Sequence, residues 1–258
     1  MATQIDQLGT TLTLNARGST VSVGTTNAIS IVGGYDKSQA ADSVVAGEAI
    51  GVNGGTQAAR LFGEGSELHR AVAAATANPV GTVYAVPLPE VDTTETVTGV
   101  SSGTLNNAPV FTEAFNPEHT ITATDTQSAT SMTVEISYAT PLEAPTASDT
   151  IVINPETGDF IADASSDYDI SYTYGEYSEA VTSAVSQPVR YASILTSNTG
   201  MGNLLLSEIN EEVRNGSFMR GIMGASPYIE VGAVSDYAPT VTSNRIIQVA
   251  PSHAMNRL

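Results

Sequence analysis

The sequence has no cysteine, and its only lysine is Lys37. Without cysteine there are no disulfides, no thiolate catalysis and no cysteine-ligated zinc sites. Basic residues are scarce overall, because 9 lysines and arginines stand against 27 aspartates and glutamates, for a net charge of −18. Residues 71–189 contain no lysine or arginine at all. Since nucleic acids and anionic membranes are bound through cationic side chains, we expect neither as a direct partner.

Long hydrophobic runs are absent as well. No apolar stretch approaches the roughly 20 residues that cross a bilayer, and the N-terminus MATQIDQLGTT lacks the basic and apolar parts of a signal peptide. We therefore expect a soluble protein without membrane insertion. The 258 residues are 41% hydrophobic, which is enough for the core of one large domain or two ordinary ones.

The acidic, lysine-poor composition is similar to that of proteins from salt-loving organisms. Concentrated salt screens repulsion between like charges, so a carboxylate-rich surface costs little stability there. We expect adaptation to high salt, with an ordinary acidic protein as the alternative.

The first third of the chain alternates strand and helix patterns. AISIVGG at residues 28–34 and GTVYAVPL at residues 81–88 are apolar runs typical of buried strands. Between them QAARLF, capped by Thr56 and ended by Gly63, and ELHRAVAAATA, capped by Ser66, predict two helices. The order of strand, helices and strand predicts a parallel crossover unit.

Residues 91–175 are rich in threonine and serine and have no helical periodicity. Turn signals such as NPETGD separate short alternating runs, which are HTITATD, SMTVEISYA, DTIVINP and YDISYTYG. This pattern predicts an all-β insertion domain, a small sandwich or barrel.

Helix and strand patterns then return. Residues 177–186 and MGNLLLSEINEEVRNG, which Gly216 ends, predict helices, and VRYASILTS predicts a strand. The predicted fold class is an α/β core, a mixed and largely parallel sheet with flanking helices, interrupted by the all-β insertion. We expect an N-terminal arm or strand at residues 1–25, the core at residues 26–90 and 176–258, and the insertion at residues 91–175.

FGEGSEL at residues 62–68 is the strongest candidate for a ligand-binding loop, because glycine-rich turns before helices can bind anions. It matches neither G-x-x-x-x-G-K-S/T nor G-x-G-x-x-G, since Leu68 stands at the place of the last glycine. Glu64 and Glu67 would also repel phosphate. We interpret FGEGSEL as a joint between two helices, with Ser66 as the N-cap.

The sequence predicts no catalytic, cofactor-binding or metal-binding residues. The three histidines follow no metal-binding pattern and are expected on the surface or in the core; they are His69, His119 and His253. No serine lies in a G-x-S-x-G pattern.

Two further patterns have plain interpretations. Asp163, Asp167 and Asp169 resemble part of a calcium loop without its glycine and final glutamate, so we expect solvated loop carboxylates. Asn215-Gly216-Ser217 matches a glycosylation acceptor, but the end of a helix already explains Gly216.

Four segments, taken in chain order, carry a resemblance to a known family. They are NAISIVGGYDKSQAAD, TQAARLFGEGSELHRAVAAATANPVGTVYAVPL, INPETGDFIADASSDYDISYTYGEYSEAV and SNRIIQVAPS. These segments resemble the first core strand, the helix–joint–helix–strand run, the return from an inserted β domain and a late core strand of contractile tail sheath proteins, found in tailed viruses and related injection systems. Sheath subunits continue past the last of these strands, so the resemblance implies that a C-terminal part of the family is missing here.

The resemblance implies a structural protein of the virion, without catalysis or cofactors, and together with the acidic, lysine-poor composition it leads us to expect a haloarchaeal virus as the source. Sheath subunits assemble in the host cytoplasm as helical rings around a tail tube, and contraction drives the tube through the host envelope. The implied partners are other copies through exchanged terminal strands, the tube protein, and the baseplate and terminator proteins. The alternating run at residues 10–23 is suited to a neighbour's sheet edge, with pairing inside its own chain as the alternative.

Two other classes stay open. The threonine- and serine-rich region also fits another virion or cell-surface β-rich protein, such as a tube, baseplate, adhesion or receptor-binding component. The crossover pattern also fits an α/β enzyme that handles nucleotides or sugars.

Overall fold

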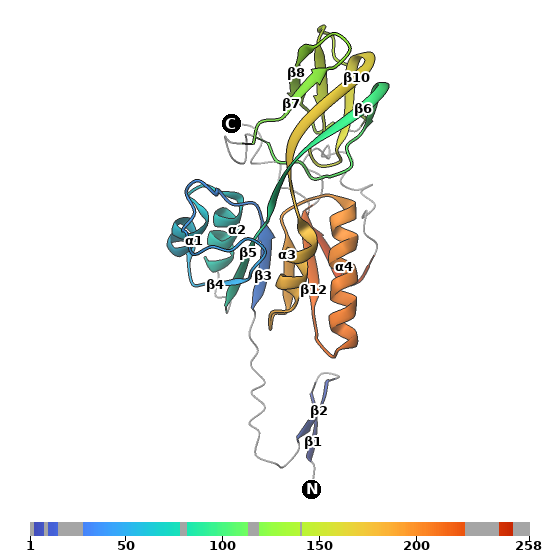
Figure 1. Ribbon diagram of the computed structural model, residues 1–258. Coiled ribbons are helices and arrows are strands. Elements are labelled where there is room, and N and C mark those ends of the chain that lie inside the picture. The colour runs from blue at the N-terminus through green and yellow to red at the C-terminus, as the bar shows by residue number, and fades with distance from the viewer. Residues whose placement is uncertain are drawn as a thin grey trace.

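The computed structural model describes residues 3–7, 10–14, 28–77, 82–112, 119–139, 141–224 and 243–249. Over these residues the protein has a mixed α/β fold. A six-stranded sheet flanked by helices carries a five-stranded sheet at one end, and two long strands run from one to the other (Figure 1).

The six-stranded sheet is parallel except at one edge. Its order is β13 (Ile246–Val249), β12 (Arg220–Gly224), β11 (Tyr191–Ile194), β3 (Ile29–Gly33), β5 (Val83–Pro87) and β4 (Ile50–Val52). The parallel pairing of β3 with β5 confirms the predicted crossover unit. The short β4 is antiparallel to β5 and was not predicted, because three residues carry too little pattern.

Helices cover both faces of this sheet. They are α1 (Gly55–Phe62), α2 (Glu67–Thr76), α3 (Tyr177–Val185) and α4 (Thr199–Arg214). Because side chains alternate along a strand, Ile31 of β3 packs in the cluster of α1 and α2, and Val32 packs in the cluster of α3 and α4. Figure 1 shows the two helix pairs on opposite sides of β3 and β5.

The helix ends agree with the sequence at three of four predicted positions. Ser66 caps α2, Gly63 follows the end of α1 with φ 85°, and Gly216 follows α4 with φ 96°. Thr56 as the cap of α1 is wrong, because Gly54 occupies the N-cap and makes no side-chain hydrogen bond there. An extended Gly54 starts the helix two residues earlier, so Thr56 lies inside the first turn.

The five-stranded sheet is built only from residues between β5 and α3. Its strands are β6 (Glu90–Thr104), β7 (Thr122–Asp125), β8 (Thr130–Ile136), β9 (Thr150–Ile153) and β10 (Asp159–Gly175). The sheet closes on itself, since β9 pairs with both β8 and β10. It has its own apolar cluster, with Ile151, Ile153 and Ile170 fully buried.

The N-terminal residues form a separate ribbon. β1 (Thr3–Gln7) pairs antiparallel with β2 (Thr10–Leu14), and among the described residues neither strand pairs with another element. The predicted strand at residues 10–23 is thus confirmed at residues 10–14, where it pairs inside its own chain. The rest of that predicted strand, and His253, lie outside the described residues.

Candidate functional site at the junction of the two sheets

FGEGSEL is the joint between two helices. Ser66 Oγ accepts a hydrogen bond from His69 N at 3.2 Å, and His69 Nδ1 accepts one from Gly65 N at 2.9 Å. The side chain of Ser66 is buried. Both Ser66 and His69 are therefore engaged in holding the joint, which confirms the capping interpretation.

Glu67 connects this joint to the sheet. Its Oε2 accepts a hydrogen bond from Gly34 N at 3.0 Å, just after β3 ends. The connections from β3 and β11 leave toward opposite sides of the sheet here, and ligands bind at such a point in open α/β sheets. A side chain at Gly33 would overlap Leu195, which follows β11, so the two strand ends are tightly packed.

A carboxylate of the same chain lies at this end of the sheet. Glu156, in the turn between β9 and β10, accepts hydrogen bonds through Oε2 from Thr196 Oγ1 at 2.9 Å and Ser197 N at 3.3 Å. Asn198 Nδ2 donates to the backbone oxygen of Glu156 at 2.6 Å. Asn198 is also the N-cap of α4, where the helix dipole favours negative charge.

Little space remains beside these contacts. The cavity at the junction measures about 20 Å³, room for about one water molecule. Its lining comes from both sheets and their connections: Glu67, Pro109, Val110, Phe111, Tyr138, Pro155, Glu156, Tyr177, Leu195 and Thr196. In this conformation the site holds the two sheets together and has no room for a nucleotide.

The surroundings at the junction shift the pKa values of Glu67 and Tyr177. The pKa of Glu67 is raised to about 7, chiefly by burial; the hydrogen bond from Gly34 lowers it, and the negative charge of Glu156 raises it. Burial and the charges of Glu67 and Glu156 also raise the pKa of the Tyr177 hydroxyl. Glu67 therefore takes up a proton near neutral pH.

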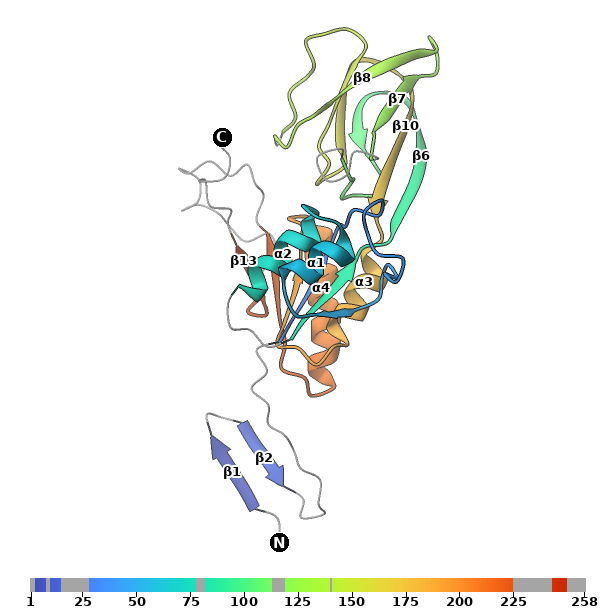
Figure 2. The same ribbon diagram turned by 90° about the vertical axis from the view of Figure 1, so that its left-hand side faces the viewer.

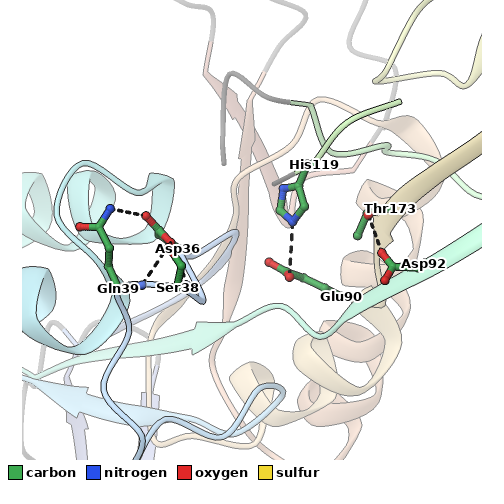
Figure 3. A network of polar contacts seen from close by, with 7 residues as sticks. All are labelled: Asp36, Ser38, Gln39, Glu90, Asp92, His119 and Thr173. Carbon is green, nitrogen blue, oxygen red and sulfur yellow. Dashed lines mark hydrogen bonds and ion pairs between the residues drawn. The ribbon is translucent and has the colours of Figure 1, made fainter. Parts of the chain in front are cut away.

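A second contact lies where β6 leaves the α/β layer. Glu90 Oε2 lies 3.4 Å from His119 Nε2, and both side chains are largely buried (Figure 3). The His119 ring stacks on Phe111 with 5.1 Å between centroids. Three buried atoms here, Glu90 Oε1, Thr112 Oγ1 and His119 Nδ1, have no hydrogen-bond partner within the described structure. His119 is thus a core residue, as expected.

Further hydrogen bonds lie near the contact between Glu90 and His119, between strands β6 and β10 and in the loop after β3. Asp92 Oδ1 accepts from Thr173 Oγ1 at 2.6 Å across the β6–β10 pair. In the loop after β3, Asp36 Oδ1 accepts from Ser38 N at 3.0 Å, and Gln39 donates to the same carboxylate (Figure 3). Figure 3 shows that these groups come from separate segments around the start of β6.

The expectation that Asp163, Asp167 and Asp169 lie in a loop is wrong, because all three belong to strand β10, where they bond to different partners. Asp163 accepts from Asp149 N, Asp167 from Gly99 N, and Asp169 from Thr96 Oγ1. Where the structure describes the chain, no three histidine or acidic side chains converge on a possible metal position. At the glycosylation pattern, Asn215 caps the end of α4.

The sequence missed the junction because its groups come from distant segments. NPETGD indicated a turn, but not that Glu156 would bond to Thr196, forty residues later.

Within the described part of the chain, no helix is long and apolar enough to cross a membrane. In comparisons with known proteins, no protein-family model and no curated protein sequence match this chain.

Proposed function

We propose that this protein is the subunit of a contractile tail sheath, from a virus of a salt-loving archaeal host. The observation that supports this most is the path of the chain. The segments from β3 to β5 and from α3 to β13 build the six-stranded sheet and its helices, and the segment between them builds one closed sheet. Together with the four segments that resemble sheath proteins, this order favours a core carrying an outer module.

In this proposal residues 91–175 form an all-β insertion domain. The core consists of residues 26–90 and 176–258, and residues 1–25 form the arm. The separate apolar cluster of the five-stranded sheet and the two connecting strands support this division. The Glu156 and Glu90 contacts would then keep the domain fixed to the core while subunits move relative to each other.

The proposed role is mechanical and needs no catalysis or cofactor. Copies would form helical rings around a tail tube, bounded by baseplate and terminator proteins, and the location would be the virion after assembly in the host cytoplasm. The β1–β2 ribbon supports an exchange of terminal strands between subunits, because a two-stranded ribbon leaves edges that the sheet of another subunit can extend. The carboxylate-rich surface would face concentrated salt.

Sedimentation velocity in molar and in dilute potassium chloride tests the assembly step. A sheath subunit is expected to form particles far larger than one chain in molar salt. A monomer at every protein concentration and salt concentration would contradict the proposal.

One observation favours the second candidate, a β-rich adhesion or receptor-binding component. A polar hollow of about 360 Å³ lies on the β6–β10 pair, lined by Asp92, Thr93, Thr94, Thr120, Ser171, Tyr172 and Thr173. Hydroxyls beside an aromatic ring suit a sugar. Binding of a glycan by the full chain, abolished by Thr94→Arg in this hollow, would support this candidate over the sheath.

A further inference from the structure

Three arginines meet at the amino-terminal edge of the six-stranded sheet, opposite the junction. Arg190 precedes β11, Arg220 begins β12, and Arg245 precedes β13. Arg220 N donates to Arg190 O at 3.0 Å, and Gly221 N donates to Arg245 O at 2.7 Å, so the three backbones lie side by side. One edge thus concentrates three of the nine basic residues of a chain with net charge −18.

These arginines line an open pocket of about 350 Å³. Its lining is Arg190, Tyr191, Phe218, Met219, Arg220, Asn244 and Arg245, and no carboxylate of the described residues belongs to it. Phe218 is 84% exposed. Arginine beside exposed aromatic rings is a combination enriched at protein interfaces. Among the described lining residues the positive charge of the arginines therefore has no acidic neighbour, and it lies next to apolar surface.

The pocket continues along the edge strand. Because Gly221 pairs with Ile246, Arg220 and Arg245 stand at equivalent positions and face the same side of the sheet. Ile247 and Val249 of β13 share that side and are 39% and 53% exposed. Figure 2 shows β13 at the outer edge of the layer. The surface is therefore basic at one end and apolar along its length.

A small phosphate fits this edge poorly. The neighbouring helices α3 and α4 end here, so this edge offers none of the free N–H groups by which a helix N-terminus binds phosphate. A polypeptide carboxylate fits better, because guanidinium groups bind carboxylates through paired hydrogen bonds and the adjoining apolar residues can contact Phe218. Copies of this chain supply that chemistry, since residues 71–189 contain acidic residues and no lysine or arginine.

We propose that this arginine pocket binds a carboxylate-bearing segment from residues 71–189 of a second copy of the chain. The inference rests on the self-assembly in the proposed function, but not on contraction. It adds a side-chain interface that is distinct from the exchange of terminal strands.

Charge reversal in the full-length chain tests it. Arg220→Glu with Arg245→Glu is compared with Lys37→Glu and Arg60→Glu, two exposed residues whose reversal changes the net charge equally. By sedimentation equilibrium we expect self-association at least about tenfold weaker in the pocket variant and unchanged in the control. Equal association of both variants would overturn the pocket interface and leave the sheath proposal standing. Absence of association in the unaltered chain would overturn both.

Photo-crosslinking gives a second readout that does not depend on the folding of the charge variants. Phe218→p-benzoylphenylalanine places the reactive group at the exposed rim of the pocket. In a mixture of isotopically light and heavy protein, we expect crosslinks between copies to peptides of residues 71–189 that contain aspartate or glutamate. Crosslinks only within one chain, or only to peptides outside that range, would overturn the proposal.

Discussion

The Glu156 carboxylate accepts a hydrogen bond from the Thr196 hydroxyl, with 2.9 Å between Oε2 and Oγ1. This contact joins the turn before β10 to the segment between β11 and α4. It places the chain's own negative charge at a helix N-terminus, at the position where related sheet arrangements bind ligands. The junction is therefore a structural connection, and four of its properties can be tested in solution.

Removal of the Glu156 side chain should weaken the junction. Glu156→Ala leaves Thr196 Oγ1 and Ser197 N without their acceptor, so we expect a loss of about 1–3 kcal/mol in the free energy of unfolding. Hydrogen exchange should also rise at residues 195–198. The control, Glu143→Ala at an exposed position, should change stability by less than about 0.5 kcal/mol. Equal free energies of unfolding for Glu156→Ala and Glu143→Ala would contradict a stabilising role for the Glu156 hydrogen bonds.

Glu67 should make stability depend on pH. Its pKa is about 7 in the folded protein against 4.5 for the ordinary side chain, so between these values the native state holds a proton that the unfolded state has lost. The contribution of Glu67 to the free energy of unfolding should therefore fall as pH rises from 4.5 to 7. Urea unfolding of wild type and Glu67→Gln measures this contribution. The free energy of unfolding of wild type minus that of Glu67→Gln should decline between pH 4.5 and pH 7. A constant difference would contradict the shifted pKa.

Ser66→Ala should reduce stability without revealing a ligand site. Loss of the N-cap acceptor for His69 N should cost about 1 kcal/mol in the free energy of unfolding. Thermal unfolding measures this against Ser101→Ala, at an exposed position of β6. If Ser66→Ala left the stability unchanged but abolished nucleotide binding, the enzyme hypothesis would replace the capping interpretation.

Gly63 and Gly65 form a matched pair in the same joint. Both have positive φ, 85° and 84°, so alanine at either should cost about 1 kcal/mol of conformational strain. At Gly63 the added Cβ would also lie 2.7 Å from Asp36 Cβ, whereas at Gly65 it meets open space. Gly63→Ala should therefore be the more destabilising of the two in denaturant unfolding. The reverse order would show that the contact with Asp36 relaxes easily.

The six-stranded sheet and its helices were predictable, because the apolar runs and helix-end residues in the sequence agree with how these elements pack. β3 and β5 are covered on both faces, so they appear in the sequence as continuous apolar runs, and Ser66 and Gly216 mark the helix ends. β6 was not predicted as one long strand, because most of its side chains are exposed and it depends on pairing with β10.

The junction was less predictable than the layer. The sequence suggested that Glu67 repels a phosphate, but only the fold places it against Gly34 and near Glu156. Likewise, nothing local in the sequence pairs Glu90 with His119. Contacts between segments far apart in the chain depend on topology, which the pattern of each segment does not contain.

Electron microscopy of the purified full-length chain in molar salt tests the central claim most directly. A contractile sheath subunit should form hollow tubes with a regular helical repeat, or stacked rings of the same diameter. Uniform monomers under these conditions, or closed particles without helical order, would contradict the proposed function.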